Sequence, residues 1–481
     1  MAYIDRELVE REMKYWRIPG AALAVVGDGI EEEFECFGFR DRENGLPFDE
    51  DTLFCIASCS KAMTSALIAR LVAEGTLDYD KPVNSYIPEF GLFDPDASES
   101  FTLRDMLCHR TGFGAHDVLW PADRGELARR MRYIEPCDTF RGRSLYSNVI
   151  YALIGYVAEY VTGKTWPDLM KEYIFEPLHM DRTTCTAEGI IHDPDMAQPY
   201  YVIDGENVKV PFWNIDGGGP AASVNTTIRD FAKWLRFNIA GGVNEDGIRL
   251  IPEGIFADMH SPQIEYKDFL PADKYPCDSY CMGWRDGQYK GHRFQKHSGC
   301  IEGYCSFQMF MPDDRIGVLV MLNIQGPAAS FSHSMAYIII DKVLKLGNED
   351  WPHLFHDDGE RAPLSSYLGF YTDVASQRLP RSLEGLLMTV PESAFIGEYL
   401  NPGHGTVRVY SQEDRLMLHY RDQDLPLRHW GADAFIMENV KADTQTMKVP
   451  VTFIKNEFGE VIKVAIGYEP QVEDIIFIRR V

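Results

Sequence analysis

Positive charge is scarce in this sequence. Its 481 residues include 47 lysines and arginines against 73 aspartates and glutamates, which gives a formal net charge of −26. Such an acidic chain repels both the phosphate backbone of nucleic acids and the anionic surface of a membrane. We therefore expect no nucleic-acid partner and no membrane partner. The net charge says little about a small substrate, because an active site can oppose the sign of the whole surface.

Long hydrophobic runs are missing as well. The longest, such as Ile316–Leu322, fall far short of the ~20 residues that a membrane-spanning helix needs. The first residues are charged from Asp5 onward and contain neither the basic nor the apolar region of a signal peptide. Without an export signal, the ten scattered cysteines are expected to be reduced thiols, and the sequence predicts a cytoplasmic protein.

Metal ligands at characteristic spacing are also absent. Cys277 and Cys281 stand close together, but no second pair completes a zinc site, so we expect no metal. Hydrophobic residues make up 45% of the chain and charged residues 25%, which is usual for a globular protein. The length suggests two or three domains.

Strand patterns occur at both ends of the first 346 residues, with helical patterns between them. Residues 21–39 predict a β-hairpin and residues 58–74 an amphipathic helix. From 76 to about 260 the pattern is mostly helices and long loops. Strand patterns return over 280–323, and 331–346 predict a closing helix. One sheet built from both ends, with a helical insertion, is the economical α+β arrangement.

The tail has a different character. Residues 347–390 show weak periodicity and are expected to be a linker between a first domain, 1–346, and a last domain, 391–481. This last domain contains eight short apolar runs with turn residues between them, which predict a small β-barrel or sandwich. It offers no obvious chemistry, and His404 and His429 are expected to be surface or packing residues.

The first candidate for chemistry is Ser58-Cys59-Ser60-Lys61. Ser58 lies between a strand-like run and the amphipathic helix, so its hydroxyl is expected at a helix N-terminus, where N–H groups favour negative charge. Lys61 follows one turn later on the same face. A buried lysine can take the proton of a neighbouring hydroxyl when desolvation lowers its pKa. The alternative is a helix-capping serine beside a surface lysine.

The second candidate is Tyr146-Ser147-Asn148. A phenol has a pKa of about 10 and serves as a base at neutral pH only beside cations, of which Lys61 is the candidate. The Asn148 amide is placed to bind Lys61 or a substrate carbonyl. The alternative is a loop tyrosine and a helix-capping asparagine.

The third candidate is His297-Ser298-Gly299, inside a predicted strand. Alternation places His297 and Gly299 on one face, and a glycine lets a ligand approach the backbone closely. The next N–H group, that of Cys300, would then form an oxyanion hole with the N–H of Ser58. The alternative is a structural histidine whose hydrogen bonds are satisfied within the fold.

In this order the three motifs resemble those of the serine β-lactamase-like and penicillin-binding family, in particular its class C and D-aminopeptidase branch. The resemblance covers residues 5–345, and residues 391–481 resemble the lipocalin-like barrel often fused behind this catalytic domain. Four further stretches are close to the family pattern: LVAEGTLDYDKPVNSYIPEF (71–90), FTLRDMLCHRTGF (101–113), GPAASVNTTIRDFAKWL (219–235) and GHRFQKHSGCIEGYCSF (291–307).

The resemblance implies an α+β fold of the β-lactamase/DD-peptidase type: an antiparallel sheet flanked by helices, a helical subdomain and an appended antiparallel β-barrel. It implies Ser58 as the nucleophile that accepts the acyl group, and Lys61 and Tyr146 as groups that share the general-base work. Asn148 would orient the substrate or Lys61, and the N–H groups of Ser58 and Cys300 would hold the oxyanion. It implies no metal or organic cofactor.

One departure bears on the substrate. Penicillin-recognising relatives usually carry Lys-Thr-Gly where this chain has His297-Ser298-Gly299, so a permanent ammonium is replaced by a near-neutral imidazole. Lys296 is adjacent, but alternation directs it to the other face of the strand. The departure favours a hydrolase or acyltransferase acting on small amides, short peptides, D-amino acid derivatives or esters, and the lack of an export signal points the same way. A class C-type β-lactamase, a silent binding protein and a homo-oligomer remain open.

Overall fold

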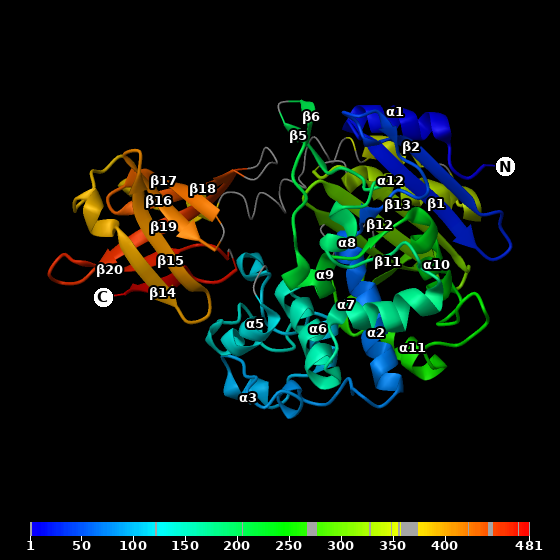
Figure 1. Cartoon of the computed structure of the whole chain (residues 1–481), viewed down its shortest axis with the longest axis horizontal. Coiled ribbons are helices and arrows are strands. Elements are labelled where there is room, and N and C mark those ends of the chain that lie inside the picture. Colours follow the sequence, from blue (N-terminus) through cyan, green and yellow to red (C-terminus); the bar gives the residue numbers. More distant parts are fainter. Residues whose placement is uncertain are drawn as a thin grey trace.

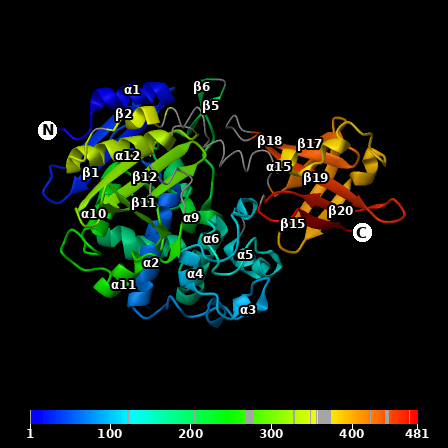
Figure 2. The same ribbon diagram turned by 180° about the vertical axis from the view of Figure 1, so that it is seen from behind.

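An antiparallel sheet runs through the larger part of the chain and draws its strands from both ends of that part (Figures 1 and 2). β1 lies between β2 and β13, so that Ala21 pairs with Phe37 on one side and with Leu322 on the other. The prediction of one sheet built from both ends is confirmed. Among the described residues the strands, in the order in which they lie side by side, are β3 (Leu46–Pro47), β2 (Glu33–Asp41), β1 (Gly20–Gly27), β13 (Ile316–Leu322), β12 (Tyr304–Met311), β11 (His292–Ile301), β10 (Arg285–Tyr289), β9 (Ser279–Tyr280) and β8 (Ile264–Glu265).

The computed structural model carries side chains for most of the sequence. It describes residues 2–480 apart from 121–122, 204, 267–276, 327–328, 348, 355, 357–373, 422, 441–445 and 470.

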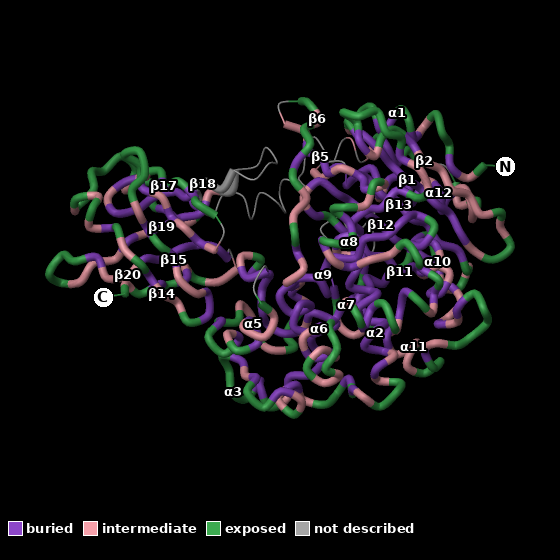
Figure 3. The backbone as a smooth tube through the Cα atoms, viewed as in Figure 1, coloured by how far each residue is buried: buried purple, intermediate pink, exposed green. Residues whose placement is uncertain are grey.

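The central strands are apolar along their whole length because both faces of the sheet are covered. In β1, Ala22, Ala24 and Val26 belong to one hydrophobic core, whereas Leu23 and Val25 belong to the other. Successive side chains of a strand point to opposite faces, which explains the division. Figure 3 shows β1, β12 and β13 buried. A strand buried on both faces reads as a continuous apolar run rather than an alternating one.

Helices from opposite ends of this part cover the first face of the sheet. α1 (Arg6–Trp16) and α12 (Ala329–Leu344) pack there, and α12 confirms the predicted closing helix. α2 (Ser60–Ala73) and α10 (Ile228–Ile239) pack on the second face. α2 confirms the predicted helix but not its amphipathic character: nearly all of the helix is buried, because the helical region encloses its outer side. No described helix has both the length and the apolar character needed to cross a bilayer.

A helical region follows α2, as the residue pattern predicted. Two short strand pairs lie outside the main sheet: β4 (Phe54–Cys55), just before α2, pairs with β7 (Asn225–Thr226), and β5 (Tyr200–Ile203) pairs with β6 (Glu206–Lys209). The described α-helices of the region are α3 (Pro95–Ser98), α4 (Leu103–Leu107), α5 (Arg124–Arg130), α6 (Asn148–Thr162), α7 (Trp166–Met170), α8 (Glu188–Ile191), α9 (Gly219–Ala222) and α11 (Glu253–Met259).

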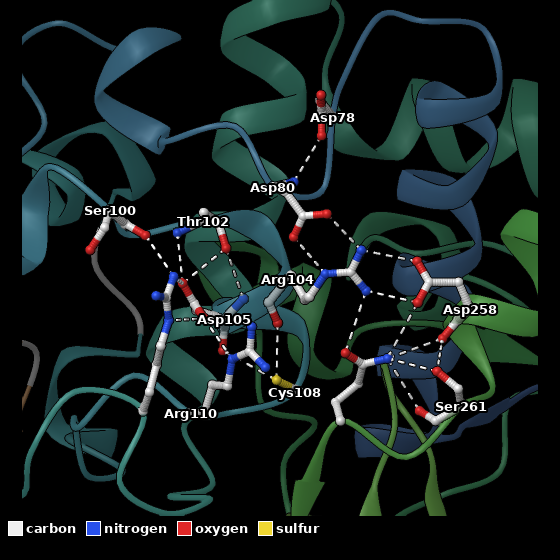
Figure 4. Close-up of polar contacts among 12 residues, drawn as sticks. Asp78, Asp80, Ser100, Thr102, Arg104, Asp105, Cys108, Arg110, Asp258 and Ser261 are labelled. Atoms are coloured by element: carbon white, nitrogen blue, oxygen red, sulfur yellow. Dashed lines mark hydrogen bonds and ion pairs between the residues drawn. The ribbon is translucent and has the colours of Figure 1, made fainter.

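An ion-pair network ties α4 to its surroundings (Figure 4). The Arg104 guanidinium donates to the carboxylates of Asp80 and Asp258, which joins α4 to α11. The neighbouring Asp105 is fully buried and accepts from Arg110 at 2.6 Å and from Arg141 at 2.8 Å. Burial alone would raise the pKa of Asp105, but the hydrogen bonds and charges of these two arginines outweigh it, and the pKa lies below its usual range.

We expect Asp105→Asn to lower the free energy of unfolding by about 2–3 kcal/mol at neutral pH, because two guanidinium groups lose their buried counter-charge. A carboxyl group with a lowered pKa stabilises the fold above its unfolded value, about 3.9, and the contribution is lost as the pH falls through the folded-state pKa. Urea unfolding should therefore show that the free energies of unfolding of the wild type and Asp105→Asn approach each other below about pH 4.

Asp80→Asn makes the same chemical change at a side chain that is 63% exposed. We expect this control substitution to lower the free energy of unfolding by less than about 1 kcal/mol, because solvent screens an exposed ion pair. An equal loss in the free energy of unfolding in the two variants would show that burial does not strengthen the ion pairs of Asp105.

Eight antiparallel strands close into a barrel at the end of the chain. The residue pattern left barrel and sandwich open, whereas the family resemblance implied a barrel, and the pairing of β14 with β21, Tyr399 opposite Arg479, confirms the barrel. His404 is buried against Phe477, so it is the packing residue that was expected. The strands are β14 (Gly397–Asn401), β15 (Gly405–Gln412), β16 (Arg415–Tyr420), β17 (Gln423–Gly431), β18 (Ala434–Val440), β19 (Thr446–Lys455), β20 (Val461–Ile466) and β21 (Ile475–Arg479).

The predicted linker, 347–390, lies only in part within the described residues. Its described section includes the short helix α15 (Val374–Arg378). Ala375 and Leu379 pack against Ala434 and Ile436 of the barrel, so this section is folded onto the last domain.

Candidate active site

Ser58 lies in a tight turn that leads from β4 into α2. The turn is a 3-10 segment, Ala57–Cys59, and Ala57 has φ +46°, a left-handed conformation that non-glycine residues seldom adopt. Backbone strain of this kind collects at functional sites because the surrounding structure must hold it. Ser58 is half-buried whereas Ala57 and Cys59 are buried. The turn therefore presents one hydroxyl at the start of the helix, as the sequence predicted.

Lys61 reaches this hydroxyl from one turn further along. Its Nζ donates to Ser58 Oγ at 3.1 Å, to Asn148 Oδ1 at 2.7 Å and to the Ala221 carbonyl at 3.0 Å. The side chain is fully buried, and burial is the main reason why the pKa of Lys61 lies well below its usual range. A buried amine with a lowered pKa can exist as the neutral base at moderate pH. The arrangement is not that of a surface lysine.

Tyr146 lies on the other side of Lys61. The centre of its ring is 4.6 Å from the Lys61 Nζ and 6.1 Å from the ring centre of His297. Asn148 is the first residue of α6, and its side chain turns to Lys61 instead of capping the helix. The structure thus brings together the four residues of the first two motifs: Ser58, Lys61, Tyr146 and Asn148.

The His297 side chain lies within β11 and is fully buried. Its Nδ1 is 2.7 Å from the Ser298 carbonyl, and its Nε2 is 3.1 Å from the hydroxyl of Tyr280. Because a carbonyl oxygen only accepts, Nδ1 carries the proton, and in the neutral ring Nε2 accepts from the Tyr280 hydroxyl. His297 therefore positions Tyr280 of β9, a residue to which the sequence analysis gave no role.

Gly299 sets the distance between β11 and the turn that carries Ser58. A Cβ on Gly299 would lie 2.8 Å from the backbone nitrogen of Ser58 and 2.3 Å from the carbonyl oxygen of Ile56. No side chain fits between these two segments. The N–H of Cys300 follows one residue later, on the strand that lies against the Ser58 turn.

The cysteines near the site differ in exposure. Burial raises the pKa of Cys55 and of Cys59 to about 12, so neither forms a reactive thiolate. Cys300 is exposed, and its Sγ lies 2.7 Å from the Sγ of the buried Cys305. Within the described residues, no three His, Cys, Asp or Glu side chains gather as metal ligands would.

Arg285 brings a permanent positive charge next to the third motif. Its Nη1 donates to Ser298 Oγ at 3.4 Å, from the neighbouring strand β10. Lys296, by contrast, lies on the other face of the sheet near the Tyr337 ring of α12, as alternation predicted. Sequence spacing could not show this contact, because Arg285 reaches the motif across a strand pair.

Two further residues of the site escaped the sequence analysis. His109 lies behind Tyr146, with ring centres 4.6 Å apart, and its Nδ1 accepts the Ser147 N–H at 3.2 Å. Burial and then the charge of Lys61 keep the pKa of His109 well below its usual range. Asp117 accepts from Asn148 Nδ2 at 3.0 Å. His109 stood in the quoted stretch 101–113, whereas nothing in the sequence marked Asp117.

The fold and the three assembled motifs define a protein of one family. Residues 6–339 match the family model described as Beta-lactamase, and the chain belongs to this family. Residues 388–478, which hold the barrel, match a domain of unknown function, DUF3471.

Individual proteins and solved structures are similar to this chain over most of its length. The unguisins hydrolase ungD of Aspergillus violaceofuscus is 25% identical over an alignment that covers 99% of this chain and 90% of that protein. The octameric penicillin-binding protein homologue from Pyrococcus abyssi has a TM-score of 0.59 at 21% identity and covers 98% of this chain and 100% of its own. The D-amino acid amidase from Ochrobactrum anthropi SV3 has a TM-score of 0.59 at 20% identity, over 71% of this chain and 99% of its own.

Proposed function

We propose that this chain is a serine hydrolase that cleaves small amide, peptide or ester substrates, D-amino acid derivatives among them, through an acyl-enzyme on Ser58. The observation that carries the proposal is the 3.1 Å contact between the Ser58 hydroxyl and the fully buried amine of Lys61. A nucleophile within hydrogen-bond reach of a base with a lowered pKa is the requirement for covalent catalysis.

The reaction follows from these positions. Neutral Lys61 takes the proton of Ser58, and the Oγ attacks the substrate carbonyl carbon while the N–H groups of Ser58 and Cys300 hold the oxyanion. The bond to the leaving amine or alcohol then breaks. Tyr146 gives its phenolic proton to that group and regains one from the Lys61 ammonium. Water attacks the acyl-enzyme by the reverse route and releases the acid and Ser58.

The relatives support the substrate class. One is named an unguisins hydrolase, and a neighbour in fold is titled a D-amino acid amidase. The missing lysine of the third motif also favours amides and esters over penicillins. Arg285 beside Ser298 favours a second candidate, a class C-type β-lactamase, because β-lactams carry a carboxylate that a guanidinium can bind.

A substrate panel tests the proposal. We would compare kcat/KM for p-nitrophenyl butyrate, the amides of D- and L-phenylalanine, and a chromogenic cephalosporin, and measure the intact mass of the protein during turnover. We expect ester turnover, a D-amide rate above the cephalosporin rate, and an added acyl mass on the intact protein that Ser58→Ala lacks. Turnover of the cephalosporin alone would favour the β-lactamase. No acylation with any substrate would favour a binding protein.

A further inference from the structure

The barrel reaches into the catalytic part of the chain through the loop after β20. Glu469 of this loop is only 2% exposed, and its Oε2 accepts the backbone N–H of His116 at 2.8 Å. Its Oε1 accepts the N–H of Gln471 at 3.2 Å. A Cβ on Gly114 would lie 2.8 Å from the Gln471 side-chain oxygen, so the two loops are in direct contact.

Successive residues of the segment held by Glu469 contact the barrel and the active site in turn. His116 has φ +44° and precedes the 3-10 segment Asp117–Leu119. The His116 ring lies 5.6 Å from the ring of His404 in the barrel, and Val118 packs against the barrel core. Asp117, between these two residues, accepts from Asn148 in the opposite direction. The barrel therefore fixes the residues on both sides of Asp117.

Asp117 decides which end of the Asn148 amide faces Lys61. An amide has a donor end and an acceptor end, and a carboxylate can only accept. With Nδ2 bound to Asp117 at 3.0 Å, Oδ1 must point to the Lys61 Nζ, 2.7 Å away. If the amide turned over, its NH₂ group would face the lysine and bring two donors together. The orientation of Lys61 toward Ser58 thus depends on a residue that touches neither of them.

We propose that Asp117 is a positioning residue for acyl transfer, and that the barrel, through Glu469, holds Asp117 in place. The barrel would then be a structural part of the active site. The inference rests on the proposed function, because it concerns the base that activates Ser58. It assigns the last domain a task that its own residues, which offer no chemistry, did not suggest.

Electrostatics supply a readout that a purely structural residue would not move. The titratable and charged groups around Lys61 are Asp117, Arg285, Cys59, His109, Tyr146 and Tyr151. Burial is the main cause that lowers the pKa of Lys61, Arg285 lowers it further, and the charge of Asp117 raises it. Removal of that charge should therefore lower the pKa of Lys61 again.

Two substitutions separate the charge of Asp117 from its hydrogen bond. Asp117→Ala removes both, and we expect kcat for p-nitrophenyl butyrate to fall about 10- to 100-fold with little change in KM, because the base is misplaced while the substrate contacts remain. Asp117→Asn keeps an acceptor oxygen but loses the charge. We expect it to shift the acidic limb of the kcat/KM profile to lower pH.

The barrel is tested at Glu469. Glu469→Gln keeps an oxygen for the His116 N–H and should retain most of the activity. Glu469→Met removes the acceptor and should reproduce the kcat loss of Asp117→Ala. Glu473→Gln, at an exposed position of the same loop, is the matched control and should behave as the wild type. Thermal unfolding of each variant identifies one that fails to fold.

A titration of Lys61 distinguishes failure of this inference from failure of the proposed function. In protein labelled with ¹⁵N-lysine, the Lys61 signal is the one that Lys61→Arg removes, and its pKa can be read without any substrate. A lower Lys61 pKa in Asp117→Asn supports the positioning role even if no substrate is turned over. An unchanged Lys61 pKa together with a wild-type kcat in Asp117→Ala would overturn it. A wild-type kcat in folded Glu469→Met would overturn the part assigned to the barrel.

Discussion

Ser58→Ala should abolish turnover of every substrate that the wild type accepts. We expect kcat for p-nitrophenyl butyrate to fall by at least about 10⁴-fold, because removal of a nucleophilic serine leaves only binding and oxyanion stabilisation. An activated ester reacts without many specific contacts to the enzyme, and its hydrolysis therefore tests the catalytic residues alone. The measurement is the initial rate at saturating ester, together with the intact mass, which should show no acyl adduct.

Ser85→Ala is the matched control for Ser58→Ala. Ser85 is exposed, and its hydroxyl donates only to a carbonyl within its own turn. We expect this variant to keep the wild-type rate. If Ser58→Ala and Ser85→Ala hydrolyse the ester equally well, Ser58 is not the nucleophile. The Lys61 amine would then not serve to activate Ser58.

Substitution of Lys61 should give the second large loss of activity. Lys61→Met removes the base that lies 3.1 Å from Ser58 Oγ, and we expect kcat/KM to fall about 10³- to 10⁴-fold. Lys61→Arg should be no better, because a guanidinium stays protonated and cannot accept the proton of Ser58. In the wild type the rate should rise with pH through the pKa of Lys61, because only the neutral amine is the base, and burial places this rise well below the pKa of an ordinary lysine.

The outcome for Lys61→Arg separates two roles of the lysine. Substantial activity in this variant would mean that the site needs a positive charge rather than a base. Lys171→Met changes a side chain that is 71% exposed and should leave kcat/KM unchanged. Pre-steady-state acylation measured by rapid quench would show whether the loss lies in acylation, as we expect.

Local signals in the sequence were enough to predict the turn and helix around the nucleophile. An apolar strand, a serine and an amphipathic helix define one geometry, and the spacing of Lys61 from Ser58 places both on one face. The central strands were recognised for a similar reason, since short apolar runs that are bounded by turn residues are typical of buried strands. The structure contains these features because short-range preferences and tertiary packing agree there.

The parts that escaped prediction depend on contacts between distant segments. Arg285 meets Ser298 only through the register of β10 with β11. Asp117 lies in a loop whose conformation is set by Glu469, a residue of another domain. The closure of the barrel depends on the pairing of its first and last strands, and the alternation within one strand is the same in a barrel and in a sandwich. No periodicity in a single sequence encodes such partners.

The place of β1 inside the sheet, between β2 and β13, affects the order in which this protein can fold. β1 emerges from the ribosome among the first segments, yet Ala21 finds its partner Leu322 only after most of the chain has been synthesised. Until then β1 exposes an unpaired strand edge, and such edges are prone to aggregate. β11, which faces the nucleophile, joins the sheet equally late. The active site of the catalytic domain therefore cannot form step by step during translation. Truncated chains that end before β13 should be inactive and should be bound by chaperones.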